Sequence, residues 1–584
     1  MNQQLEHKRH TLAHLLAAAV LEKYPHAKLT LGPAIDTGFY YDIDFSGGDT
    51  PGDEDLKVLQ KDMKKLLNKW TEFTHEVVSA ETAKEKFAGN QFKLELINEI
   101  EGRGETITLY TCGGFTDLCR GGHLENPKAE INTDAFKLDK IAGAYWRGNE
   151  KNPMLTRIYG LAFDTVEELE AYEKQIAEAK ERDHRKLGKE LDLFTFSDLI
   201  GPGLPLFTPK GTLMRDLIVE KIMQIQSKFG YQKVSIPHIT KSDLYKTSGH
   251  WDKFGDELFK VKGQSDTEFV LKPMNCPHHT QIFDSKPHSY KELPIRYAET
   301  TMVYRDEQQG ELLGLSRVRS ITQDDGHVFC TVDQIEQEVE NIVNVIREFY
   351  QSLGMYKEGN FWVSLSVRDS QDPDSYLGDK DTWDKAENIL ETVAQKLSLP
   401  YKKIEGEAAF YGPKLDFMFL DALGRERQLA TAQLDFVMPD RFKLSYVDQT
   451  GAKQTPVMIH RAIAGSLERF MAIMIEHFAG AFPLWLSPEQ IRVIPVSDAQ
   501  KEYATHVYTE LKAIGLRVTL EDHNDSLGKK IRSAKKDKLP YFIVIGDKEI
   551  QEKNVTLESR DGTSGQMTLS VLANHLLTEI EMVA

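Results

Sequence analysis

Residues 304–330, YRDEQQGELLGLSRVRSITQDDGHVFC, decide the fold more than any other stretch of this chain. Arg305 and Glu307 stand two residues apart, as do Arg317 and Arg319 beyond a glycine-containing loop, and residues two apart share one side of a strand. Guanidinium groups grip phosphate in a bidentate manner and a carboxylate accepts from an exocyclic amine, which suits a nucleoside triphosphate. Ordinary charge pairs on a sheet surface give the same spacing, so spacing alone leaves both interpretations open.

The segments around this stretch predict an antiparallel sheet covered by helices. In KLDFMFLDA, residues 414–422, apolar Leu415, Phe417 and Phe419 alternate with other residues at the period of a strand. Apolar residues recur at helical spacing over 331–353. The strands between about 185 and 485 are separated by turns more than by regular helices, which favours antiparallel pairing.

Composition sets the broad class. The chain has 584 residues, 40% hydrophobic and 28% charged, which is typical of a globular protein with two to four domains. A net charge of -18 argues against a general nucleic-acid coat but allows a local basic surface. Four cysteines are too few for a disulfide scaffold, so a reducing compartment is expected.

The first residues superficially resemble a signal peptide. Lys8-Arg9-His10 precede TLAHLLAAAVL, but His14 interrupts the apolar run, which continues into Glu22 and Lys23 as a helix would. No apolar stretch approaches the ~18 residues of a membrane span. We therefore expect a cytoplasmic protein that makes no contact with a membrane.

Changes of pattern divide the chain into four parts. Residues 1–165 mix a helix over 10–24 with strand-like pieces such as GFYYDIDF, and charged residues 166–188 predict a solvated linker helix. Prolines and glycines in GPGLPLFTPKG open the largest part, 189–485. Residues 488–584 alternate strands with helices and predict a small α/β domain.

Two further motifs place the chain in a known family. HRAIAGSLERF (460–470) sets Arg469 near the start of a helix that runs to His477, an ordinary helix start when taken alone, and SIPHI contains Pro237. Together with 304–330 these resemble the three signature motifs of class II aminoacyl-tRNA synthetases. The words KPMNC, AFYGPKLDF, TAQLDF and MIHRAIAGSLERF resemble the threonyl-tRNA synthetases in particular.

The resemblance implies an α+β multidomain protein. It places a class II antiparallel catalytic core at 189–485, an N-terminal α+β editing domain at 1–165 and a C-terminal α/β anticodon-binding domain at 488–584. It also implies a homodimer formed through the region around Pro237. Members commonly begin with a small TGS domain, whereas this chain begins directly at the editing region, so we expect a bacterial-type member without it.

The implied activity is an ATP-dependent ligase that forms threonyl-adenylate, with Mg²⁺ accompanying ATP, and then charges tRNA(Thr). Arg305, Glu307 and Arg469 are the implied catalytic residues, and Arg317 joins them in binding ATP. The implied threonine-binding residues are Met274, Gln323, Asp325, Tyr411 and Gln433. The competing hypothesis is a non-catalytic paralogue that binds RNA or a partner.

Cys276 lies in LKPMNCPHH, residues 271–279, where a buried thiol, a disulfide, a nucleophile and a metal ligand are all possible from the sequence alone. The resemblance implies one catalytic Zn²⁺ per subunit, held by Cys276, His327 and His460. Three protein ligands leave a position open for substrate. Threonine offers amino and hydroxyl groups, and a site built for a hydroxyl rejects an analogue without one by roughly 10⁴–10⁵. Relatives usually carry glycine at His278, whose role is expected to be structural or supporting.

Serine keeps the hydroxyl, so rejecting it requires a second, hydrolytic site. HTLAH and CRGGH supply His10, His14, Cys119 and His123, which by spacing resemble a four-ligand metal site or simply packed core residues. The resemblance implies instead that they edit seryl-tRNA(Thr) without an evident need for metal. The supporting residues are Lys93, Asp117 and Tyr41. Gly122 stands where proline is usual, which loosens the turn that aims His123.

The C-terminal part carries a local concentration of positive charge. GKKIRSAKKDK, residues 528–538, suits contacts with RNA phosphates, although a solvated helix face has the same composition. The resemblance implies that Asn524 and Glu549 read the anticodon. A further family arginine is replaced by Glu558, which weakens the match at that point.

Overall fold

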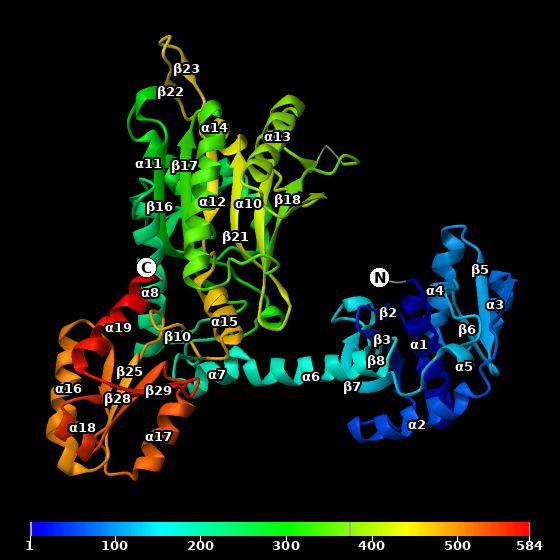
Figure 1. Ribbon diagram of the computed structural model, residues 1–584. Coiled ribbons are helices and arrows are strands. Elements are labelled where there is room, and N and C mark those ends of the chain that lie inside the picture. The colour runs from blue at the N-terminus through cyan, green and yellow to red at the C-terminus, as the bar shows by residue number, and fades with distance from the viewer. Residues whose placement is uncertain (1–2, 265, 373–374, 583–584) are drawn as a thin grey trace. The chain divides into compact units, whose positions relative to one another are not determined.

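The computed structural model describes residues 3–264, 266–372 and 375–582 (Figure 1). The chain divides into two compact units, Met1–Ala177 and Glu178–Ala584, which are treated separately below. No helix among the described residues is both long and apolar enough to cross a membrane.

The first unit is built around helix α1 (Gln3–Lys23), which starts earlier than the expected residue 10. Buried residues occur all around this helix because it lies inside an apolar core with β3 and α2. One sheet has the order β1-β3-β8-β7, with β2 paired to β3, and a second has the order β4-β5-β6. The elements are α2 (Leu56–Leu67), α3 (Ala80–Lys86), α4 (Gln91–Gly102), α5 (Pro127–Glu130), β1 (Lys28–Leu29), β2 (Ala34–Ile35), β3 (Gly38–Asp44), β4 (Thr74–Val78), β5 (Ile107–Cys112), β6 (Phe115–Leu118), β7 (Phe136–Tyr145) and β8 (Met154–Ala162).

The expected single linker helix over 166–188 is wrong, because two helices occupy this segment. These are α6 (Val166–Arg182) and α7 (His184–Glu190). Asp183 leaves the helical conformation and its side chain accepts the N–H of Arg185, which caps the start of α7. His184 and Leu187 are buried, so α7 belongs to a packed core. The charge of the segment hides this burial, since only a few of its residues face inward.

The second unit contains the expected antiparallel sheet. Its eight strands have the order β11-β16-β17-β24-β21-β20-β18-β19. Neighbours are antiparallel except at the two edges, where β11 joins β16 and β19 joins β18 in parallel. The strands are β11 (Gln232–Lys233), β16 (Ile295–Tyr304), β17 (Ser320–Cys330), β18 (Phe361–Val367), β19 (Tyr401–Glu405), β20 (Lys414–Leu420), β21 (Glu426–Asp435) and β24 (Val457–Ala462).

Helices cover this sheet and complete its core (Figure 1). The helix expected over 331–353 is α12 (Ile335–Ser352), whose buried stripe includes Ile342, Ile346 and Phe349. That stripe packs in one apolar cluster with strand residues such as Leu415 and Phe417. Other helices of this part of the chain include α8 (Pro209–Ser227), α9 (Ser242–Ser248), α11 (Cys276–Asp284), α13 (Lys380–Lys396) and α15 (Leu467–His477).

The C-terminal part of the second unit is a small α/β fold, as expected. Its sheet has the order β26-β25-β27-β28-β29. β25 pairs in parallel with β26 and β27, whereas β28 and β29 add antiparallel strands at one edge. The elements are β25 (Ile491–Pro495), β26 (Val518–Leu520), β27 (Tyr541–Ile545), β28 (Val555–Ser559), β29 (Ser564–Met567), α16 (Lys501–Ala513), α17 (Leu527–Lys536), α18 (Asp547–Glu552) and α19 (Leu569–Met582).

Candidate active site and a second histidine–cysteine site

The segment between β16 and β17 is a folded loop, so Arg305, Glu307 and Arg317 do not lie on strands as their spacing suggested. A tight turn joins Leu313 to Arg317: the Leu313 N–H donates to the Arg317 carbonyl at 3.2 Å, and the reverse bond measures 3.3 Å. Nε of Arg317 donates to Glu307 at 2.8 Å. Because the turn reverses the direction of the chain, Arg317 comes into contact with Glu307 although neither residue lies on a strand.

All four predicted ATP-binding residues line one cavity of about 480 Å³: Arg305, Glu307, Arg317 and Arg469. Ser466 caps α15 by accepting the N–H of Arg469 at 3.2 Å. Burial lowers the pKa of both Arg305 and Arg469, and the Arg305 guanidinium lies 4.7 Å from the centre of the Phe254 ring. Arg305 is half-buried, so less water competes with a polyanion there, whereas Arg469 is exposed.

A smaller cavity of about 90 Å³ adjoins the first. Its walls include His327 and His460. They also include all five predicted threonine-binding residues: Met274, Gln323, Asp325, Tyr411 and Gln433. Gln323 also lines the larger cavity, so the two spaces share a wall. The Tyr411 hydroxyl donates to Gln433 at 2.7 Å, and the Asn275 amide donates to Asp325 at 3.1 Å. Burial raises the pKa of Asp325.

Two residues of the smaller cavity, His327 and His460, belong to a cluster that could hold a metal ion, and the third member, Cys276, does not line the cavity. The ligand atoms of Cys276, His327 and His460 lie within 4.8 Å of one another. His327 on β17 and His460 on β24 are directly opposed in register, whereas Cys276 begins α11. Nε2 of His327 lies 3.1 Å from Nδ1 of His460. Tertiary structure alone brings these three residues together.

The donor set fits zinc. Nε2 of His460 lies 2.9 Å from the carboxylate of fully buried Asp435, which accepts a hydrogen bond from the Nε2–H and so leaves the Nδ1 lone pair to bind metal. One sulfur, two nitrogens and an adjoining cavity match the donor set of catalytic zinc sites, which keep one position open for substrate. Burial raises the pKa of the Cys276 thiol well above its usual value, so metal binding has to displace the thiol proton.

Sequence reasoning missed three supporting residues of this cluster. Asp435 follows Gln433 by two positions in TAQLDF, so strand periodicity could have placed it on the same face. Nδ1 of His279 lies 2.7 Å from Nδ1 of His327, and His250 Nε2 lies 3.9 Å from the Cys276 sulfur. His278, which the sequence singled out, is buried with neither ring nitrogen hydrogen-bonded to any described residue. The neighbouring imidazole that touches the cluster is therefore His279.

The first unit holds a second histidine–cysteine cluster. α1 carries His10 and His14, while Cys119 and His123 follow β6, and their ligand atoms also lie within 4.8 Å of one another. The Cys119 sulfur lies 3.2 Å from Nε2 of His123 and 3.5 Å from Nε2 of His10. The outer nitrogens face neutral groups: His10 Nδ1 lies 3.2 Å from the Gly122 carbonyl, and His123 Nδ1 lies 3.4 Å from the Thr11 hydroxyl.

A cavity of about 350 Å³ opens beside this cluster. His10, His14 and Cys119 line it, but His123 does not. The predicted supporting residues share the wall as a buried polar group: Lys93 pairs with Asp117 at 2.5 Å, and the Tyr41 hydroxyl donates to Asp117 at 2.5 Å.

The second cluster is uncharged at neutral pH. Burial raises the pKa of Cys119 to about 11, and burial also lowers the pKa of His14 and His123 far below the usual value. A neutral thiol is a poor nucleophile, whereas a neutral imidazole can accept a proton. Gly122 has φ +81°, which a proline ring cannot adopt. The turn before His123 therefore has a backbone conformation that proline at this position would not allow.

The two predicted anticodon residues lie in different surroundings. Asn524 is exposed in the loop between β26 and α17. Glu549 is buried, and its carboxylate accepts the Gly546 N–H at 2.8 Å and the Thr556 hydroxyl at 2.7 Å. Glu549 therefore caps α18 within its own domain. The exposed cations of α17 include Arg532, Lys535 and Lys536.

Family models match three parts of the chain. They are the tRNA synthetase class II core domain (G, H, P, S and T) over 259–478, an anticodon-binding domain over 490–579, and the threonyl and alanyl tRNA synthetase second additional domain over 107–159. Together with the antiparallel sheet, they define a class II aminoacyl-tRNA synthetase with an editing domain.

Curated relatives narrow this to one family. The chain is 48% identical to a threonine–tRNA ligase from Gloeobacter violaceus, covering 97% of this chain and 91% of that one. It is 46% identical to one from Synechococcus elongatus, covering 99% and 96%. A solved structure titled the RNA binding domain of threonyl-tRNA synthetase from Cryptosporidium parvum matches with TM-score 0.64 and 38% identity, covering 68% of this chain and 98% of that one. The chain belongs to the threonine–tRNA ligase family.

Proposed function

We propose that this chain activates L-threonine with ATP and Mg²⁺ to threonyl-adenylate and transfers the threonyl group to tRNA(Thr). The observation that carries the proposal is the shared wall at Gln323. It sets an arginine-lined cavity against a smaller cavity lined by His327 and His460, which cluster with Cys276. A triphosphate in the first space and an amino acid in the second would meet at that wall.

Each side chain then has a defined task. The threonine carboxylate attacks the α-phosphorus in line, a P–O bond forms, and the bond to pyrophosphate breaks. Half-buried Arg305 stabilises the reacting phosphate, and Arg469 stabilises the departing pyrophosphate. Glu307 positions Arg317 and faces the same cavity. Zinc held by Cys276, His327 and His460 would supply a Lewis acid for the amino and hydroxyl groups of threonine, which valine cannot match.

We propose that the second cavity hydrolyses seryl-tRNA(Thr). A water oxygen attacks the ester carbonyl carbon, a neutral imidazole of His10 or His14 accepts the water proton, and the proton passes to the departing ribose oxygen as the C–O bond breaks. Lys93, Asp117 and Tyr41 orient the aminoacyl end. The high thiol pKa makes Cys119 a neutral wall group rather than a nucleophile.

The remaining assignments rest on the family. We propose that α17 and Asn524 contact tRNA. Glu549 would contact the anticodon only if its carboxylate released the Gly546 N–H and the Thr556 hydroxyl. A cytoplasmic homodimer would use the exposed segment around Pro237. The proposed domains are 1–165 for editing, 189–485 for activation and 488–584 for the anticodon.

Threonine-dependent exchange of pyrophosphate into ATP tests activation. The zinc-loaded chain should catalyse exchange with threonine but not with valine, and Arg305→Ala should abolish it. Absence of exchange by the wild-type chain would instead support a non-catalytic paralogue. Editing has its own assay: the wild type should deacylate seryl-tRNA(Thr), and His14→Ala should not. Persistence of seryl-tRNA with the wild type would remove the editing proposal and leave activation untouched.

A further inference from the structure

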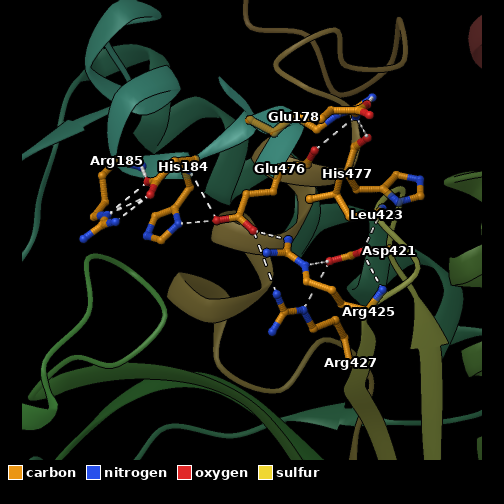
Figure 2. Close-up of polar contacts among 11 residues, drawn as sticks. Glu178, His184, Arg185, Asp421, Leu423, Arg425, Arg427, Glu476 and His477 are labelled. Atoms are coloured by element: carbon orange, nitrogen blue, oxygen red, sulfur yellow. Dashed lines mark hydrogen bonds and ion pairs between the residues drawn. The ribbon is translucent and has the colours of Figure 1, made fainter. Parts of the chain in front are cut away.

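His184, the first residue of α7, links two distant segments of the second unit. Its Nδ1 lies 2.7 Å from the carboxylate of Glu476 on α15, and the N–H of Leu315 donates to its Nε2 at 3.1 Å. Figure 2 shows the ring beside Glu476, with Arg425 on the other side of that carboxylate. His184 is almost fully buried, so water does not compete for these bonds.

The partners fix the tautomer of His184. A backbone N–H can only donate, so Nε2 must present its lone pair to Leu315. Nδ1 then carries the proton and donates it to the carboxylate of Glu476. Asp183, His184 and Glu476 lie close enough together to hold a metal ion, but both ring nitrogens and both carboxylate oxygens already have protein partners. The arrangement is therefore a hydrogen-bonded link.

Glu476 is itself firmly held. Its second oxygen accepts from Arg425 at 2.5 Å, and Arg425 also donates to Asp421 at 2.6 Å (Figure 2). Burial alone would raise the pKa of Glu476, but hydrogen bonds from His184 and Arg425 lower it below its usual value. The carboxylate thus stays charged and fixed, which anchors the His184 ring.

The other end of the link is the loop of the ATP cavity. Leu315 is buried and directly precedes Ser316 and Arg317, both of which line that cavity. Gly314 lies close to His184: it has φ +51°, and a Cβ there would overlap His184 Nε2 and the Arg185 side chain. The loop therefore fits against the imidazole through both a hydrogen bond and a close backbone approach.

We propose that His184 is a positioning residue for ATP. By accepting the Leu315 N–H, it holds the turn that presents Ser316 and Arg317 to the nucleotide, while Glu476 supplies the fixed support. The proposal rests on the proposed activation of threonine by ATP. His184 itself does not line the ATP cavity, so its effect passes through the loop.

Two variants separate the two hydrogen bonds. The amide of His184→Gln reaches the place of Nε2 and can still accept from Leu315. The shorter amide of His184→Asn reaches only the place of Nδ1 and can still donate to Glu476. In pyrophosphate exchange, His184→Asn should raise the KM for ATP on the order of tenfold, because a buried N–H loses its acceptor. His184→Gln should stay within about threefold of wild type, and neither should change the KM for threonine.

His288 provides a matched control. It is also buried, its Nδ1 lies 3.0 Å from Glu292, its Nε2 lies 2.8 Å from the Phe283 carbonyl, and it lines neither cavity. His288→Asn should leave the KM for ATP unchanged, and the fall in its melting temperature measures the cost of losing such a link. An equal rise in the KM for ATP in His288→Asn would overturn the proposal, as would equal effects of His184→Asn and His184→Gln.

Gly314→Ala tests the same contact from the loop side and serves if His184→Asn does not fold. The added methyl overlaps the His184 ring and the Arg185 side chain, and φ +51° strains alanine, so the loop should shift off His184 and the KM for ATP should rise while the KM for threonine stays constant. An unchanged KM for ATP in a folded Gly314→Ala protein overturns the proposal. Because the wild type is assayed alongside, loss of this effect is distinct from failure of the proposed activity, in which the wild type itself shows no exchange.

Discussion

The two histidine–cysteine clusters use the same residue types in opposite surroundings. Cys276, His327 and His460 are buried, two of them opposed on neighbouring strands, and one imidazole is held by a carboxylate. In the other cluster, His10 and His123 are only partly buried on a helix and a loop, and their outer nitrogens face a carbonyl and a hydroxyl. The first cluster suits a cation, whereas the second suits proton transfer by uncharged imidazoles.

The two clusters differ in the group that contacts the outer nitrogen of an imidazole ring. Asp435 places a negative charge behind His460, which makes the ring a stronger donor to metal. Nothing comparable stands behind His10 or His123 among the hydrogen bonds of the described residues, and burial keeps Cys119 protonated. Residue type and proximity are alike in the two clusters, whereas the charge of the group hydrogen-bonded to the outer ring nitrogen differs.

Cys276→Ala should have the largest effect. Removing a ligand costs more than the roughly 10–100-fold lost with an outer partner, so threonine-dependent exchange should fall by about a thousandfold or more. Elemental analysis should find one zinc per wild-type chain and none in the variant. Cys330→Ala, at another buried thiol, should keep its zinc. A second zinc that survives Cys276→Ala would break the comparison between the clusters.

Cys119 should be unusually slow to alkylate. With its pKa raised by burial to about 11, its thiolate fraction at pH 7.5 is roughly a hundredfold below that of an ordinary thiol. Peptide mass spectrometry after treatment with iodoacetamide should show the rate at Cys119 rising about tenfold per pH unit up to that pKa. The urea-unfolded chain is the control. Alkylation of the folded chain at the free-thiol rate would show a thiolate and contradict a protonated Cys119.

Asp435→Asn should weaken zinc binding by roughly 10–100-fold, since the ring of His460 loses its anionic partner. Competition with a chromogenic chelator measures the affinity. The matching change in the other cluster is Thr11→Val, which removes a neutral partner of His123. It should alter seryl-tRNA deacylation by less than about fivefold. Similar losses from both variants would mean that charge in the outer layer does not distinguish the clusters.

The smallest effect concerns acid stability of the first unit. Burial lowers the pKa of His14, so below the unfolded value of about 6.5 the unfolded chain binds a proton that the folded chain does not. Stability is therefore lost as pH falls, by about 1.4 kcal/mol per unit for this residue. Urea-dependent hydrogen exchange of α1 peptides at pH 6.5 and 5.5 measures the slope. His14→Gln should flatten it, and an unchanged slope would show that His14 is protonated in the folded state.

Local patterns predicted much of the fold but failed where partners are distant. The alternation in 414–420 and the helical spacing after residue 331 correctly predicted β20 and α12, because both report a buried face directly. The spacing of Arg305 and Glu307 misled, since a loop brings them together. The charged segment from 166 concealed α7, whose buried His184 takes part in contacts with Glu476, 292 positions away.

The sequence by itself determined the class of protein, the antiparallel core and the residue types of each site, because periodicity and long motifs are local properties. Only the tertiary structure decided which residues meet: it opposed His327 to His460, placed Asp435 beside His460, and set His184 between Glu476 and the loop of the arginine-lined cavity. Strand register and burial fix those contacts, and both depend on packing across the whole unit.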